Sequence, residues 1–184
     1  VEQGDQINSS AGSSYADSMF LYLNNTLITA TNEASINQNV TATDVGINWL
    51  KVAAKNDITT VYDSTSYFVR PPINVAELPA GVKNGANYVN DNTVILALYA
   101  PFKEYVFVLS DVDDWQLSET NYMNRTPDGN WYWLQIDGVV PQQEYAYQYL
   151  VDASLRVADP YTQKVLDPWN DPYISNATYP NLKP

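Results

Sequence analysis

The stretch Val106-Phe107-Val108-Leu109-Ser110-Asp111-Val112-Asp113-Asp114-Trp115 decides the fold of this chain. Every residue from Tyr105 to Leu109 is aromatic or apolar. A short run of this kind favours a strand buried on both faces over a helix. The aspartates that follow interrupt the run and predict a turn, with Trp115 just beyond it.

Three neighbouring segments have the same character. Each is short, rich in aromatic or apolar residues and bounded by Asp, Gly, Pro or Asn: Thr93–Pro101, Gly129–Ile136 and Glu144–Asp152. Proline ends the first of them, because proline cannot donate a hydrogen bond to a strand ladder. Short aromatic strands separated by turn residues are typical of an antiparallel sandwich.

The first part of the chain shows a comparable but weaker pattern. Six or so short strands are predicted there, from Gln6–Ala11, Met19–Leu23, Thr26–Thr31, Ala34–Ala42, Gly46–Ala54 and Ile58–Tyr62, which continues outward into Ser66–Val69. Asn24-Asn25 predicts a hairpin turn, since Asn tolerates the positive φ that such turns require. Alternation places Ile47, Trp49 and Lys51 on one face of their strand. We expect Trp49 to pack in the core or between the domains.

The expected fold class is therefore all-β, with two tandem immunoglobulin-like β-sandwich domains. Arg70-Pro71-Pro72 ends the first sandwich, because paired prolines cannot join a ladder. The predicted boundaries are 1–72 for the first sandwich, 73–90 for a linker, 91–161 for the second sandwich and 162–184 for a connector.

Composition excludes several classes of function. The chain has 184 residues, no cysteine, no histidine and a net charge of −12. This charge argues against nucleic acid and anionic membrane surfaces as partners, because both need a basic surface. No apolar run approaches the roughly 20 residues of a membrane helix, and no signal peptide is recognisable. Because the sequence starts at Val1 rather than Met, we expect it to be a piece of a longer chain.

Six motifs follow one another in order through the second part of the chain. They are Leu98–Pro101, Ser110–Trp115, Met123-x-Arg125, Asp128-Gly129-x-Trp131, Tyr145–Asp152 and Ala158–Tyr161. This ordered set resembles the early-set, immunoglobulin-like domain that precedes the catalytic barrel in bacterial alpha-amylases and related enzymes of glycoside hydrolase family 13. It is also similar to the family-48 carbohydrate-binding modules and to the glycogen-binding module of AMP-activated kinase.

The resemblance implies that the parent protein is a bacterial, starch-degrading alpha-amylase or pullulanase-like enzyme. We expect an extracytoplasmic location: secreted, periplasmic or on the cell surface. The parent's retaining catalytic barrel would begin just past Pro184 and would be the main partner of this region, with alpha-glucan as a second expected partner. Lys164–Tyr173 looks like the connector into such a barrel. Leu166, Trp169 and Tyr173 are the residues expected at the barrel interface.

No catalytic residue, metal or cofactor is expected in this region. Glycoside hydrolysis needs two carboxylates flanking the scissile bond, and the family's catalytic motifs also include histidines, which this chain lacks. The plentiful acids at strand ends are expected to be solvated turn residues: Asp111, Asp113, Asp114, Glu144 and Asp152. The Asp111–Asp114 cluster has the hard oxygen ligands that calcium prefers, but it lacks the spacing, central glycine and distal glutamate of an EF-hand loop.

Sugar binding is the main functional hypothesis, since glucan-binding surfaces combine flat aromatic faces with a few polar groups. By the resemblance, Trp115 stands where these modules place one stacking tryptophan. Their second tryptophan is replaced here by Leu155, and their lysine by Gln148. These departures favour packing of Trp115 on the sandwich edge over glucan binding. Trp115 and Gln148 therefore remain candidates for a weak glucan contact only. Most of the other rings are expected in the core: Trp131, Trp133, Tyr145, Tyr147 and Tyr149.

The predicted function is thus that of non-catalytic N-terminal domains in an alpha-amylase-type enzyme, which position the barrel and contact glucan weakly. Two alternatives stay open. The chain could be a free-standing glucan-binding module or surface adhesin that uses the Trp115 face, or a purely structural spacer.

Overall fold

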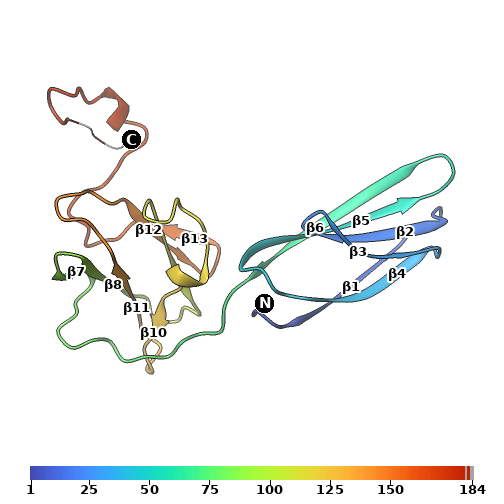
Figure 1. Ribbon diagram of the computed structural model, residues 1–184, viewed down its shortest axis with the longest axis horizontal. Coiled ribbons are helices and arrows are strands. Elements are labelled where there is room, and N and C mark those ends of the chain that lie inside the picture. The colour runs from blue at the N-terminus through green and yellow to red at the C-terminus, as the bar shows by residue number, and fades with distance from the viewer. Residues whose placement is uncertain (181, 183–184) are drawn as a thin grey trace. The chain divides into compact units, whose positions relative to one another are not determined.

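The computed structural model describes residues 1–180 and 182, and within them every strand pairing between named strands is antiparallel. The described residues contain no α-helix, only strands and two short 3₁₀ turns (Figure 1). The chain divides into two compact units, Val1–Pro72 and Ile73–Pro184. The predicted all-β fold is confirmed.

The first unit is a sandwich of a two-stranded and a four-stranded sheet. Its strands are β1 (Gln6–Gly12), β2 (Ser18–Leu23), β3 (Thr26–Thr31), β4 (Ser35–Thr41), β5 (Gly46–Lys55) and β6 (Thr60–Val69). The small sheet has the order β1-β4, and the large one β3-β2-β5-β6 (Figure 1). The two predicted segments at 58–62 and 66–69 are one continuous strand, β6.

The predicted hairpin turn between β2 and β3 is confirmed. Asn24 and Asn25 both have positive φ, at 47° and 68°. The Asn24 side chain also ties the turn to β5: its Oδ1 accepts from the Trp49 backbone N–H over 2.9 Å, and its amide donates to the buried Asn48 over 2.7 Å. The turn is therefore fixed to the middle of the sheet.

The core of the first unit lies between its two sheets and consists of Met19, Leu21, Ile36, Val40, Leu50 and Ala54. Along β5 the inward residues are Gly46, Asn48 and Leu50. Alternation therefore turns Trp49 outward, and this residue is 52% exposed. The prediction of a core Trp49 is wrong, because the second sheet of this sandwich packs on the Leu50 side of β5, opposite to Trp49.

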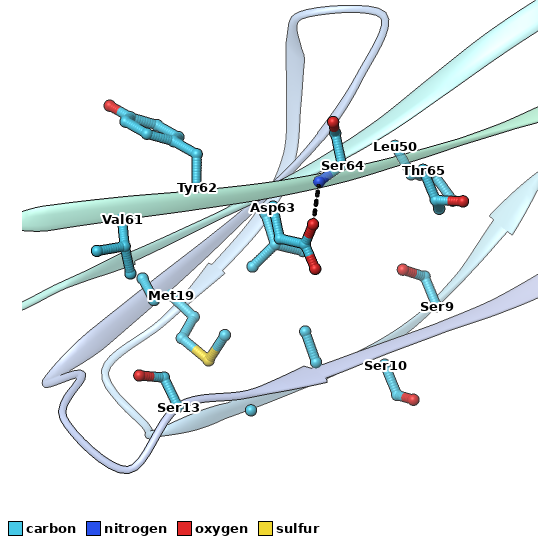
Figure 2. A pocket seen from close by; sticks show the side chains of 14 residues that line it. Ser9, Ser10, Ser13, Met19, Leu50, Val61, Tyr62, Asp63, Ser64 and Thr65 are labelled. Carbon is cyan, nitrogen blue, oxygen red and sulfur yellow. Dashed lines mark hydrogen bonds between the residues drawn. The ribbon is translucent and has the colours of Figure 1, made fainter.

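The inner faces of β1 and β6 leave an open groove of about 320 Å³ between them. Met19, Leu50 and, from β6, Asp63 are among the residues that line it (Figure 2). Figure 2 also shows Val61 on the groove side of β6 and Tyr62 on the opposite side. Tyr62 therefore belongs to the outer face of the large sheet.

The second unit also has two sheets. Its elements are β7 (Gly85–Asn90), β8 (Thr93–Tyr99), β9 (Val106–Ser110), the 3₁₀ turn η1 (Glu119–Asn121), β10 (Asn124–Arg125), β11 (Trp131–Asp137), β12 (Tyr147–Val151), β13 (Leu155–Val157) and the 3₁₀ turn η2 (Asp171–Tyr173). One sheet has the order β10-β11-β8-β7, and the other β13-β12-β9.

The apolar run that opened the sequence argument forms β9, which is buried at all five positions, as predicted. It packs with β8, β11 and β12 around one core cluster: Val94, Leu96, Leu98, Val106, Val108, Met123, Tyr132, Leu134, Tyr149 and Val151. The hydroxyl of the fully buried Tyr132 donates to the Lys103 carbonyl. Burying these large side chains contributes favourable free energy, which offsets the conformational entropy that the chain loses on folding.

The expected linker at 73–90 differs from the structure in two places. Gly85–Asn90 is strand β7, which pairs with the edge of β8. Earlier in the segment, the Ala76 N–H donates to the Arg125 carbonyl over 3.0 Å, and the Trp133 indole donates to the Ala76 carbonyl over 3.2 Å. Much of this segment therefore belongs to the second unit, because an open edge strand offers backbone groups that outweigh weak strand propensity.

Candidate functional site

Trp115 lies in a tight turn directly after β9. Asp114 and Trp115 have positive φ, at 58° and 61°, a conformation that non-glycine residues rarely adopt. The Trp115 N–H donates back to the Ser110 carbonyl over 2.8 Å, which closes the turn. Its side chain is 42% exposed, so part of the indole is available to a ligand.

The buried side-chain amide of Asn121 stabilises this turn through hydrogen bonds. Asn121, in η1, donates to the Asp113 carboxylate over 2.7 Å and to the Gln116 carbonyl over 2.5 Å. Its own oxygen accepts from the Ser118 N–H over 2.9 Å. Asp113 therefore serves to fix the turn rather than standing free in solvent.

Gln148 lies on β12, opposite Leu109 of β9, and is half-buried. Its neighbour Tyr147 pairs with Ser110, the residue to which the Trp115 turn closes. The two candidate residues thus belong to segments that meet at the end of β9. Within residues 1–180 and 182, no hydrogen bond joins their side chains.

Several other aromatic residues of the second unit have structural roles. Tyr132 and Tyr149 are fully buried. Trp131 packs edge-on against Tyr99, with ring centroids 5.3 Å apart. Leu155 begins β13 after a turn in which Asp152 and Ala153 both have positive φ, and it is 51% exposed without offering a ring. Trp115 is therefore the most exposed tryptophan of the sandwich itself.

Sequence reasoning missed a buried carboxylate in the motif Ala158–Tyr161. Asp159 is 3% exposed and accepts hydrogen bonds from the Tyr147 hydroxyl at 2.6 Å, the Tyr149 hydroxyl at 3.2 Å and the Tyr161 N–H at 2.8 Å. Burial raises the pKa of Tyr147 and that of Tyr149 well above the ordinary tyrosine value, and the neighbouring Asp159 carboxylate raises both further. The alternating tyrosines before an Asp-Pro pair were the available signal.

The three expected barrel-interface residues lie in the tail. Trp169 is 83% exposed and Tyr173 88% exposed, whereas Leu166 is half-buried. The Asp167 carboxylate accepts from the Trp169 N–H over 2.9 Å and from the Asn170 amide over 2.5 Å, and these bonds lower the pKa of Asp167. The tail is thus locally ordered while its rings face solvent.

A polar contact ties this tail back to the sandwich. The Lys164 ammonium lies 2.6 Å from the Glu144 carboxylate and 2.9 Å from the Tyr179 hydroxyl. The Tyr179 hydroxyl in turn donates to Glu144 over 2.5 Å.

No metal-binding arrangement is evident in the described part of the chain, where groups of three or more His, Cys, Asp or Glu side chains suited to an ion do not occur. The described residues also contain no helix with the length and apolarity needed to span a membrane.

Residues 83–170 match the family model of carbohydrate-binding module 48, described as the isoamylase N-terminal domain. This match confirms the resemblance noted for the second unit. No significant match was found among curated proteins.

Among solved structures, a putative alpha amylase from Salmonella typhimurium is 26% identical, over 42% of this chain and 12% of that one, with a TM-score of 0.34. A pullulanase from Bacillus acidopullulyticus is 15% identical, over 87% and 25%, with a TM-score of 0.37. A group B Streptococcus pullulanase in complex with maltotetraose is 12% identical, over 87% and 23%, with a TM-score of 0.34. The chain thus spans a quarter or less of the length of these proteins.

Proposed function

Since residues 83–170 match carbohydrate-binding module 48, we propose that this chain is the non-catalytic N-terminal region of a starch-degrading glycoside hydrolase of the alpha-amylase type. In this proposal the second unit positions the catalytic barrel and contacts alpha-glucan weakly. The family match is the observation that carries the proposal. The location is extracytoplasmic in a bacterium, where polymeric starch is met.

The glucan contact is assigned to Trp115, and Gln148 is assigned a hydrogen bond to the bound glucan. The Trp115 ring is partly exposed and its turn is held by Asn121, so little ordering is needed on binding. A single aromatic stack contributes on the order of 1–3 kcal/mol, whereas a millimolar site needs about 4 kcal/mol. The expected dissociation constant is therefore about a millimolar or weaker.

The barrel contact is assigned to Leu166, Trp169 and Tyr173. Two large rings exposed within a few residues of each other form an apolar surface that a neighbouring domain can cover. A free-standing glucan-binding module or adhesin is the alternative, and the exposed Trp115 favours it only if binding is tight.

The test is a titration of the isotope-labelled chain with maltoheptaose, followed through the tryptophan indole N–H signals in NMR spectra. The Trp115 signal should move weakly and saturably as maltoheptaose is added, and Trp115→Ala should remove the accompanying shifts of backbone amide signals in the second unit. Trp169→Ala is the matched control, because that ring is exposed but assigned to the barrel. A maltoheptaose response of the backbone amide signals of the second unit that Trp115→Ala leaves intact would refute the assignment, and micromolar affinity lost in Trp115→Ala would favour the adhesin.

A further inference from the structure

The outer face of the large sheet in the first unit combines rings with short polar side chains. The register puts Trp49 and Lys51 of β5 on this face, between Tyr22 of β2 and Tyr62 and Ser64 of β6. We call these residues, together with Asn25 of the β2–β3 turn, the Trp49 face. An antiparallel sheet normally turns a polar face to solvent, so rings exposed here require a reason.

Trp49 is one of the exposed rings of this face. The residue opposite it on β6 is Ser66, and on the β2 side its backbone bonds to Asn24. These neighbours are too short to cover an indole, which explains its 52% exposure. No hydrogen bond from the Trp49 indole N–H is found in the described part of the chain, so a ligand could accept from it.

Lys51 stands next to this ring and is held in place by the two tyrosines. Its ammonium lies 5.2 Å from the Tyr22 ring centroid and 5.7 Å from the Tyr62 centroid. Its Nζ is also 3.5 Å from the Asn25 side-chain oxygen. Cation–π contacts of this kind orient the ammonium and leave its remaining hydrogen atoms free to donate.

A shallow hollow of about 330 Å³ is lined by Asn24, Asn25, Trp49, Lys51 and Ser64. Its volume lies at the lower end of the roughly 300–1,000 Å³ of small-molecule sites. A stable protein interface needs roughly 20–30 residues a side, many more than line this hollow. A flat ring beside amide, hydroxyl and ammonium groups instead suits a pyranose, which has an apolar face and hydroxyl edges.

We propose that the Trp49 face is a binding site for a neutral oligosaccharide chain. The charge of −12 disfavours an acidic glycan. It also disfavours a second copy of this chain, which would bring two strongly negative molecules and two Lys51 side chains together. A sugar would stack on Trp49, while Lys51, Asn25 and Ser64 bond to its hydroxyls. This site is independent of the function proposed for the second unit.

The experiment titrates the chain with maltoheptaose and, separately, with cellohexaose, and follows each tryptophan indole signal by NMR. At least one sugar should move the Trp49 signal saturably. Read from backbone amide signals of the first unit, Trp49→Ala should weaken binding at this face by about tenfold or more, since a ring stack is the main contact. Trp115→Ala should leave the Trp49 response unchanged, which separates this site from that of the second unit.

Ile47→Ala is the matched control, because Ile47 lies on the same face of β5 and is 63% exposed but offers no ring. It should bind as the native chain does, and Trp49→Tyr should retain part of the affinity. Absence of any Trp49 response to both sugars at tens of millimolar would overturn the proposal. So would self-association, measured by sedimentation equilibrium, that Trp49→Ala abolishes.

Discussion

The Tyr147 hydroxyl donates a 2.6 Å hydrogen bond to the carboxylate of Asp159, twelve residues further along the chain. This bond attaches the segment after β13 to the surface of β12. Gly85 of β7 completes the contact: a Cβ at that position would lie 2.8 Å from the Cβ of Tyr161. The path of the chain out of the second sandwich is therefore fixed by a buried carboxylate.

Replacing this carboxylate should destabilise the second unit. In Asp159→Asn the new amide would face two hydroxyl donors, and at least one buried group would lose its partner. The expected loss is about 1–3 kcal/mol in the free energy of unfolding, measured by urea denaturation. Asp91→Asn, at an exposed turn of the same unit, is the control and should change little. Equal stability of the two variants would contradict the structural role of Asp159.

Stability should fall in alkaline solution. The pKa of Tyr147 and Tyr149 is raised in the folded state, mainly by burial and further by Asp159. A raised folded pKa makes the folded state hold protons that the unfolded state releases. This contribution is fully present below the ordinary tyrosine pKa of about 10 and is lost as the pH rises beyond it.

The measurement is the urea midpoint of the second unit between neutral pH and about pH 11. The double variant Tyr147→Phe, Tyr149→Phe should show a shallower loss above pH 10 than the native chain, although it starts from lower stability. Tyr15→Phe is the control, because Tyr15 is 83% exposed. An unchanged alkaline slope in the double variant would show that these two hydroxyls do not titrate differently on folding.

The Trp115 turn should depend on Asn121. Asn121→Ala removes three hydrogen bonds from a buried position, so we expect a loss of about 1–3 kcal/mol in stability and a shift of the Trp115 indole signal. Glu119→Ala changes an exposed residue of the same 3₁₀ turn and serves as the control. If the indole signal stays in place in Asn121→Ala, the turn is held by other contacts.

Trp169 should dominate quenching of the chain's fluorescence by neutral acrylamide. Trp169→Phe should lower the quenched fraction clearly, because this ring is 83% exposed. Its effect on stability should stay within about 0.5 kcal/mol, as is usual for a surface substitution. Trp133→Phe, whose half-buried ring donates to the Ala76 carbonyl, should lower stability instead. Quenching that survives Trp169→Phe unchanged would mean that the tail covers this ring in solution.

Much of the second unit could be predicted from the sequence. Four of the five residues of β9, from Val106 to Leu109, are apolar, so either register buries them, and the segments of β8, β11 and β12 are bounded by turn residues on both sides. Strand β7 could not be found this way. Its residues have weak strand propensity, and it forms because β8 presents an unpaired edge to it.

The candidate sites also combine features that the sequence predicts with features that only the tertiary structure decides. The sequence by itself determined the all-β fold, the turn before Trp115 and the alternation that puts Ile47, Trp49 and Lys51 on one face, because these follow from local periodicity and turn chemistry. Only the tertiary structure decided which face of β5 is the core. Alternation defines two faces without distinguishing them, and the β1-β4 sheet covers the side of Leu50, leaving Trp49 to solvent. Likewise, the burial of Asp159 depends on strand register across β12, which no local pattern encodes.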